Sequence, residues 1–411
     1  MSIFEGRAWI SNQGLLDVSI EVDNGYISSV KKTNLSPNKE KVKGLILPAA
    51  MDMHVHFRDP GYSHKEDWKT GSESAACGGV TAVVDMPNTN PFTSTFSLFK
   101  EKEQIAKTKS VVDFGIGINV EEKLTEQDWF DTVPAAFWKL YPYGISSDDY
   151  FRLAKEVLDK TKKPLVIHCE HPDYMHNNPL EKLSDHTKNR LVAEEKCLSE
   201  MPSSKYLHVA HLSTSNGLKN LPALSSTEVC PHHLLLNLDN CSSLDCKVDP
   251  PLRNISDNNN LYDAYRNGKI PILASDHAPH TIEEKSNNYT SCPSGGPLVQ
   301  HSLVSMLESY HNNKISLTKI VEKMCHNPAI LFDIKNRGYV KEGYFADLVI
   351  FNLNNPWTVS KDNILYKCLW SPFENKTFKS RILHTIVNGN LVYSNGTIID
   401  PVMGMKIKFK R

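Results

Sequence analysis

Short apolar runs rich in β-branched residues recur along the middle of the chain. They occupy residues 44–57, 80–87, 111–120, 135–142, 163–170, 205–213, 226–234 and 270–280. Nearly continuous hydrophobic runs, each followed by a polar or reactive residue, are typical of parallel strands that are buried on both faces. The pattern therefore predicts eight parallel strands.

Helical periodicity separates several of these runs. It is clearest at 147–160, where apolar residues recur at helical spacing. Ser146, just before this segment, and Asp149, three residues later, resemble a capping box. Strands that alternate with helices in this way predict an α/β fold, a (β/α)8 or TIM barrel. Such a barrel carries its active site at the C-terminal ends of the strands, so reactive side chains there become the candidates.

The two flanks of the chain follow a different pattern. Residues 1–43 and the segment after 343 alternate apolar and polar positions around turn signals such as Asn24-Gly25, which predicts short antiparallel strands. Neither flank is long enough to form a core alone. We therefore expect 1–43 and 343–411 to form one small β-sandwich-like domain beside a catalytic barrel at 44–342. The basic segment 405–411 is expected to be a solvated tail.

Composition narrows the class of protein. The 411 residues carry 46 basic and 47 acidic side chains without a long run of one sign, which predicts no binding to nucleic acid or to an anionic membrane. The sequence contains no run of about 18 apolar residues and therefore predicts no transmembrane helix. The nine cysteines, without Cys-x-x-Cys pairs, are typical of a reduced cytosolic enzyme with mostly buried thiols. We expect a soluble, cytoplasmic protein.

His54 and His56 are the strongest local signal for chemistry. Residues i and i+2 of a strand share a face, so both imidazoles can bind one metal ion. Two histidines satisfied by ordinary hydrogen bonds would explain the pair almost as well. Their position at the end of a buried run, just after Asp52, favours the metal.

Four more side chains stand at the ends of other predicted strands: Lys139, His168, His211 and Asp276. Each has an ordinary structural explanation, such as a helix N-cap for Asp276 or an extended surface lysine. His211 is preferred to His208, which should face the other way along the strand. Because these signals converge on one rim, we predict a two-metal site with mixed N and O ligands. That ligand set favours zinc and leaves manganese or cobalt open.

Three further residues are candidates for binding a substrate carboxylate. Arg58 lies two residues beyond His56 on the same face, and arginine is suited to bidentate carboxylate recognition. Asn88 follows the second strand and His280 lies four residues after Asp276. The competing explanation is that Asn88 is a turn residue of the segment PNTNP.

Five motifs, taken together, closely resemble the class I dihydroorotases of the amidohydrolase superfamily. They are DMHVHFRDPG at 52–61, GGVTAVVDMPNTNP at 78–91, FWKLY at 137–141, EVCPHHLLL at 228–236 and LASDHAPH at 273–280. The resemblance covers residues 44–352. It implies a cyclic amidohydrolase that reversibly converts (S)-dihydroorotate into N-carbamoyl-L-aspartate in pyrimidine biosynthesis.

The resemblance also implies a role for each candidate residue. A hydroxide that bridges two zinc ions would attack the ring amide, with Asp276 as proton shuttle and metal ligand. The other metal ligands would be His54, His56, a carboxylated Lys139, His168 and His211; the substrate carboxylate would bind to Arg58, Asn88 and His280. Tyr143 to Ser147 match a mobile loop, and the roles of Glu228 and His232 stay open. The segment SGGPLVQHSL at 294–303 departs from the usual family pattern.

Two alternatives of different kinds remain at this point. An allantoinase, a dihydropyrimidinase or a hydantoinase would share the fold and the metals, but its uncharged ring would give Arg58 no carboxylate. An inactive scaffold for aspartate transcarbamoylase should have lost ligands, whereas every matched position is present here. The sequence leaves open a homodimer and an association with aspartate transcarbamoylase.

Overall fold

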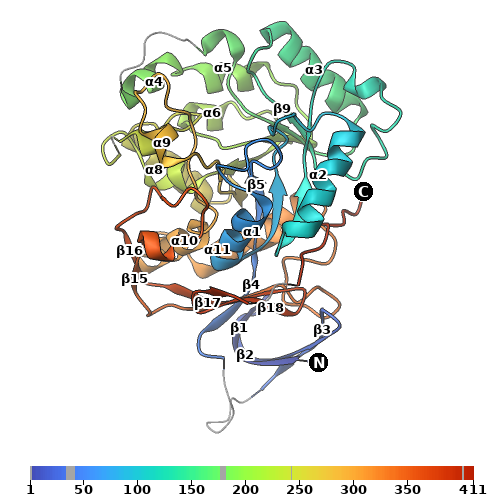
Figure 1. Cartoon of the computed structure of the whole chain (residues 1–411), viewed down its shortest axis with the longest axis vertical. Coiled ribbons are helices and arrows are strands. Elements are labelled where there is room, and N and C mark those ends of the chain that lie inside the picture. Colours follow the sequence, from blue (N-terminus) through green and yellow to red (C-terminus); the bar gives the residue numbers. More distant parts are fainter. Residues whose placement is uncertain (1, 34–41, 176–181, 242, 400–401) are drawn as a thin grey trace.

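A closed parallel barrel forms the larger part of the protein, drawn in the upper part of Figure 1. The computed structural model describes residues 2–33, 42–175, 182–241, 243–399 and 402–411. The barrel strands are β5 (Ala50–Val55), β6 (Val80–Asp85), β7 (Asp113–Ile116), β8 (Ile118–Asn119), β9 (Trp138–Leu140), β10 (Leu165–Ile167), β11 (Leu207–Val209), β12 (Ser226–Val229) and β13 (Ile272–Leu273). They pair in parallel as β5-β6-β7 and β8-β9-β10-β11-β12-β13, and a bridge between Val55 and His277 closes the ring. The predicted (β/α)8 fold is confirmed, with β7 and β8 sharing the third predicted run.

Helices cover the outside of the barrel and fill the connections between its strands. The α-helices are α1 (Trp68–Cys77), α2 (Phe96–Lys109), α3 (Ser147–Lys160), α4 (Leu183–Asn189), α5 (Ala193–Glu200), α6 (Ser215–Lys219), α7 (Pro231–Leu235), α8 (Ile255–Arg266), α9 (Ile282–Lys285), α10 (Ser302–His311), α11 (Leu317–Val321) and α12 (Asn327–Leu331). Shorter turns are η1 (Leu124–Glu126), η2 (Pro172–Tyr174), η3 (Leu244–Cys246), the π-helical η4 (Glu322–His326) and η5 (Lys361–Asn363). The α3 helix has the predicted bounds, and its N-cap Ser146 accepts the N–H of Asp149 at 3.1 Å.

The flanking segments combine into a single eight-stranded sheet below the barrel (Figure 1). Its order is β19-β18-β17-β14-β4-β1-β2-β3. The strands are β1 (Ser2–Ile10), β2 (Gly14–Asp23), β3 (Tyr26–Lys32), β4 (Leu45–Pro48), β14 (Leu348–Asn352), β17 (Arg381–Val387), β18 (Asn390–Ser394) and β19 (Thr397–Ile398), and β15 (Trp357–Thr358) pairs separately with β16 (Thr377–Phe378). We propose a domain boundary near residue 343, as expected. The other boundary is proposed near Ala49 and not at residue 43, because β4 is a strand of the small sheet.

Residues 405–411 pack against the barrel, so the expectation of a solvated tail is wrong. The N–H of Met405 donates to Asp113 Oδ1 at 2.5 Å, and the N–H of Ile407 donates to the Phe114 carbonyl at 2.8 Å. Ile407 is 2% exposed and packs among the side chains at the lower end of the barrel. The physical reason is the alternation of Ile407 and Phe409 with lysines, which gives this short strand-like segment one apolar face.

Cysteine usage differs from the expectation at one pair. Cys241 and Cys246 form a disulfide that closes a short loop. Cys169, Cys197, Cys230, Cys325 and Cys368 are buried thiols, as expected for most of the cysteines. None of the helices in the described ranges is both long and apolar enough to cross a membrane.

Candidate metal centre

A cavity of about 290 Å³ opens at the C-terminal ends of the barrel strands. It is lined by His54, His56, Arg58, Asn88, Lys139, Tyr141, Tyr143, His168, His211, Asp249, Asp276, Ala278, His280, Ser294 and Gly295. All nine candidate residues of the sequence analysis are in this set. They meet because parallel strands bring their carboxyl ends to one rim of the barrel. Tyr141, Tyr143 and Asp249 were not named as site residues. Tyr141 ends the motif FWKLY and Tyr143 begins the segment that matches a mobile loop, whereas nothing in the local sequence marks Asp249 as a cavity residue.

His54, His56 and Asp276 form the first group of potential ligands. The Nε2 atoms of His54 and His56 each lie 3.2 Å from Asp276 Oδ1. The opposite ring nitrogens are occupied, because His54 Nδ1 lies 2.5 Å from Glu228 Oε1 and His56 Nδ1 lies 2.6 Å from Asn88 Oδ1. Such partners orient a histidine and leave its Nε2 lone pair free for a metal ion.

Burial keeps both imidazoles in the form that binds metal. Desolvation lowers the pKa of His54 and holds that of His56 well below its ordinary value, so both rings are neutral near pH 7. Burial favours protonation of Glu228, but His54 and His208 outweigh it and lower the pKa of this carboxylate. His208 Nε2 lies 3.2 Å from Glu228 Oε2. His208, which was judged less suitable than His211 as a metal ligand, therefore supports the carboxylate that orients His54.

His168 and His211 form the second group of potential ligands, on the neighbouring strand ends. Their ring centroids are 4.5 Å apart. His168 Nε2 lies 2.9 Å from Glu170 Oε2, which leaves its Nδ1 for a ligand. His211 Nδ1 is buried and has no hydrogen-bond partner within the described part of the chain. Unpartnered buried nitrogen atoms of this kind are costly unless a ligand satisfies them.

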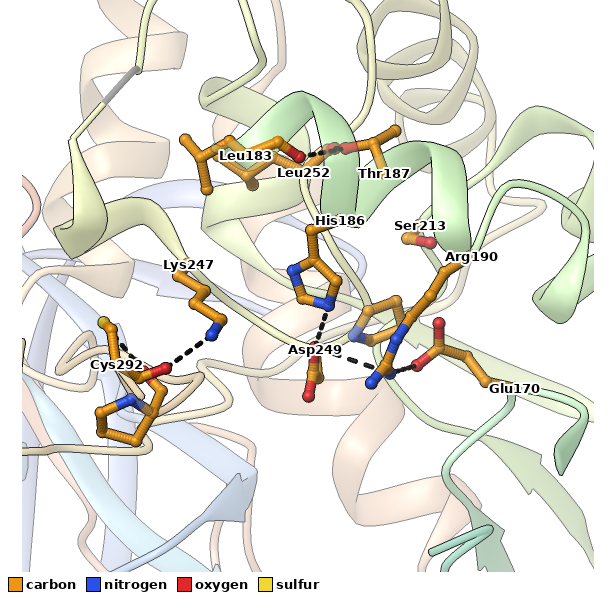
Figure 2. A network of polar contacts seen from close by, with 12 residues as sticks. Glu170, Leu183, His186, Thr187, Arg190, Ser213, Lys247, Asp249, Leu252 and Cys292 are labelled. Carbon is orange, nitrogen blue, oxygen red and sulfur yellow. Dashed lines mark hydrogen bonds and ion pairs between the residues drawn. The ribbon is translucent and has the colours of Figure 1, made fainter. Parts of the chain in front are cut away.

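Figure 2 shows the charged network that holds Glu170 beside the cavity. Arg190 Nη1 lies 2.7 Å from Glu170 Oε2 and 3.6 Å from Asp249 Oδ1, while His186 Nε2 lies 2.9 Å from the same Asp249 oxygen. Burial would raise the pKa of Asp249, but Arg190 and His186 outweigh it and lower this pKa. Both carboxylates stay charged, and Glu170 can hold the ring of His168 in place.

Lys139 lines the same cavity as the two histidine groups. Its side chain is fully buried, and its Nζ has no hydrogen-bond partner among the residues that the structure describes. Burial lowers the pKa of Lys139 to about 8, which makes a free amine accessible near neutral pH. The amine therefore has the protonation behaviour needed to react with carbon dioxide.

Three residues of the site have a strained backbone. Arg58, His211 and Asp276 have positive φ angles of 63°, 39° and 49°, a region that residues other than glycine adopt rarely. The surrounding hydrogen bonds hold this geometry: the carboxylate of Asp52, for example, accepts the N–H groups of His54 and Ser275, each at 3.1 Å. Strain that is held by the fold in this way clusters at functional sites.

Arg58 and His280 form another polar part of the cavity lining. Arg58 Nε donates to the Pro279 carbonyl at 3.1 Å and Nη2 lies 3.2 Å from His280 Nε2. His280 Nε2 also lies 3.0 Å from the carbonyl of Ser294, so the unusual segment at 294–303 borders the cavity. Arg58 is buried without a carboxylate partner among its described hydrogen bonds and ion pairs, as expected for a group that receives an anionic ligand.

This arrangement of ligands on a barrel rim matches a known family. The sequence pattern of the Amidohydrolase family matches residues 45–392. The chain belongs to this family. Members bind divalent metal, and the two histidine groups, Asp276 and the unpartnered Lys139 amine suit such ions.

Sequence relatives place this amidohydrolase among the dihydroorotases. The dihydroorotase of Methanosphaera stadtmanae is 34% identical over 93% of this chain and 94% of that protein. The dihydroorotase of Pyrococcus abyssi is 34% identical over 97% and 96%. In structure, the chain resembles the L-hydantoinase (dihydropyrimidinase) of Arthrobacter aurescens, with a TM-score of 0.87 and 23% identity over 98% of each chain. The likeness in structure supports the fold, and the sequence relatives support the activity.

Proposed function

We propose that this amidohydrolase converts (S)-dihydroorotate reversibly into N-carbamoyl-L-aspartate, the dihydroorotase reaction of pyrimidine biosynthesis. One observation carries the choice of substrate: the buried guanidinium of Arg58 faces the same 290 Å³ cavity as the candidate metal ligands. A buried cation is costly without a partner. Dihydroorotate brings a carboxylate to it, whereas dihydrouracil, hydantoin and allantoin bring none.

Two zinc ions are the proposed cofactors. His54, His56 and Asp276 would hold the first, His168 and His211 the second, and Lys139, carboxylated on Nζ, would supply oxygen ligands to both. When bound, the ions polarise the scissile carbonyl and lower the pKa of the attacking water. The proposal is supported by the neutral histidines, the orphaned Lys139 amine and the mixed N and O donors.

The residues of the chain have separate tasks in the proposed mechanism. Arg58, His280 and the amide nitrogen of Asn88 bind the substrate carboxylate and thereby fix the ring carbonyl beside Asp276. Burial raises the pKa of Asp276, which suits it to accept a proton from the attacking water and return it to the leaving ring nitrogen. Tyr143, whose hydroxyl lies 3.3 Å from His168 Nε2, borders the mouth of the cavity and would limit access of water.

The cellular setting is part of the proposal. We propose that the enzyme acts on its small-molecule substrate in the cytoplasm. None of the helices in the described ranges could span a membrane. The carbamoyl-aspartate that this enzyme would cyclise must come from carbamoyl transfer to aspartate. Aspartate transcarbamoylase is therefore the partner to test, along with self-association into a homodimer.

Metal analysis coupled to a panel of substrates tests the proposal. Purified protein should contain divalent metal and open dihydroorotate faster than dihydrouracil, hydantoin or allantoin. Faster opening of an uncharged ring would overturn the substrate assignment. Protein without bound metal or hydrolase activity, but with affinity for aspartate transcarbamoylase, would instead identify a scaffold.

A further inference from the structure

A second cluster of metal-binding residue types lies outside the lining of the cavity and outside the proposed two-metal site. Cys230, His232 and His233 directly follow β12, and their ligand atoms all lie within 4.8 Å of one another. The three residues are 0%, 2% and 1% exposed. None of them lines the cavity. The dihydroorotase chemistry proposed above gives them no task.

The histidines of this cluster have unused nitrogen atoms. Among the residues that the structure describes, both buried ring nitrogens of His232 and Nδ1 of His233 have no hydrogen-bond partner. An unsatisfied buried polar atom is unfavourable unless a ligand or water satisfies it. Three such atoms beside a buried thiol are unusual in a native interior, where nearly all buried polar groups are satisfied.

One histidine is already oriented for ligation. His233 Nε2 donates to the carbonyl of Pro250 at 3.0 Å, which fixes the tautomer and leaves the Nδ1 lone pair exposed to the cluster. Metal-bound histidines commonly donate their other N–H to such a carbonyl. Burial also lowers the pKa of His233 to about 4 and that of His232 well below its ordinary value, so both rings are neutral.

The local backbone explains why these side chains converge. Cys230 is the N-cap of α7 and has extended backbone angles, and Pro231 occupies the first helical turn. The chain therefore turns from strand to helix within one residue, which brings Cys230 and His233 to the same side at a spacing of i and i+3. Asn258 Nδ2 donates to the His233 carbonyl at 2.6 Å and holds the turn from the α8 side.

We propose that Cys230, His232 and His233 bind a structural zinc ion in addition to the two ions of the catalytic centre. One thiolate and two imidazoles are typical zinc ligands, and a small ligand such as water can complete the tetrahedron. Zinc bond lengths of about 2.0–2.3 Å require ligand atoms about 3.3–3.7 Å apart, so small side-chain rotations close the present spacing. On binding, the Cys230 thiol releases its proton to solvent and the thiolate forms the zinc–sulfur bond.

The consequence for the protein would be a fixed turn after β12. Glu228, two residues before Cys230, orients His54 in the candidate catalytic centre. A zinc ion at the turn would hold this strand end without touching substrate. The inference does not depend on the identity of the substrate.

Zinc content and X-ray absorption at the zinc edge test the site in the full-length protein grown with zinc. The wild-type protein should hold three zinc ions per chain, and its spectrum should contain a zinc–sulfur distance of about 2.3 Å, with one sulfur for every three zinc ions. The proposed catalytic ligands contain no sulfur. A zinc-loaded wild-type spectrum with only N and O neighbours would therefore overturn the proposal, even if every variant failed to fold.

Matched cysteine variants then locate the sulfur. Cys230→Ala should lose one zinc ion and the sulfur signal while keeping the other two ions. Cys325→Ala is the control, because Cys325 is also a buried thiol but its Sγ contacts the Pro48 carbonyl at 3.2 Å, away from the cluster. It should keep all three ions and the sulfur signal. An unchanged spectrum in Cys230→Ala, or the same loss in Cys325→Ala, would contradict the site. Dihydroorotate hydrolysis by the wild-type protein is measured separately, so failure of one proposal leaves the other standing.

Discussion

Replacing Arg58 with Met tests how the cavity selects its substrate. The side chain is 8% exposed, and its guanidinium is held by the Pro279 carbonyl and His280 in the cavity that the candidate metal ligands line. Met has a similar length and no charge. Because neither residue is glycine, the positive φ angle of 63° at this position strains both side chains alike. The substitution therefore removes the charge with little added change in backbone preference.

The size of the effect follows from the burial of the charge. Losing a desolvated, charge-assisted contact to a carboxylate costs about 2–4 kcal/mol. At about 1.36 kcal/mol for each factor of ten, the Michaelis constant for dihydroorotate should rise roughly 30- to 900-fold. The turnover number should fall less, because Arg58 contacts the carboxylate and not the reacting carbonyl.

The assay compares dihydroorotate with dihydrouracil, the same ring without the carboxylate. Arg58→Met should lower the ratio of activity on dihydroorotate to activity on dihydrouracil by the full 30- to 900-fold, since activity toward dihydrouracil does not use the guanidinium. Arg152→Met removes a partly exposed charge on α3 and should change the activity on neither substrate. An unchanged Michaelis constant, or an equal loss with both rings, would refute the role of Arg58.

Three other predictions concern the remaining parts of the protein. Asp276→Asn should lower kcat by about 10²–10⁴-fold, the usual contribution of a positioned proton carrier, and steady-state rates close to wild type would contradict its role. With a pKa of about 8, the Lys139 amine is about one-tenth neutral at pH 7 and about nine-tenths neutral at pH 9. Metal-stripped protein that receives zinc at a constant concentration of dissolved carbon dioxide should therefore regain activity roughly tenfold faster at pH 9 than at pH 7. A flat pH profile would argue against carboxylation, and Lys139→Ala should not reactivate at either pH. Ile407→Ala should lower the free energy of unfolding by about 2–5 kcal/mol in a urea titration, whereas exposed Lys408→Ala should stay within about 0.5 kcal/mol; equal effects would contradict packing of the tail.

The strand pattern was readable because barrel strands are buried on both faces, so an apolar run marks each one. The run at 44–57 shows the limit of this argument. It contains β4 (Leu45–Pro48) of the small sheet and β5 (Ala50–Val55) of the barrel, which part at Ala49. Both strands are apolar and buried, and hydrophobicity alone does not say which neighbour each one pairs with. The prediction for the tail at 405–411 was wrong for a related reason, because the segment pairs with Asp113 and Phe114, which lie about 290 residues earlier and come beside it only in the assembled fold.

The candidate site was predictable as a set more than residue by residue. Nine side chains at the ends of different strands converge in any parallel barrel, and all nine line one cavity. The partners behind them were not predictable. The 2.5 Å contact of Glu228 with His54 depends on the register of strands 174 positions apart in the chain. Asp249 lies on a connection without a periodic pattern, and only the folded chain places it beside Arg190.

The packing of residues 405–411 also sets an order of events during synthesis. Met405 bonds to Asp113, which leaves the ribosome 292 residues earlier. At about 5–20 residues per second, the lower end of the barrel would wait about 15–60 s for the segment that seals it. Throughout that interval a buried carboxylate and the apolar interior would face solvent or a chaperone. Completion of this barrel is therefore a late event, and a nascent chain stalled before residue 405 should remain protease-sensitive even with all its barrel strands made.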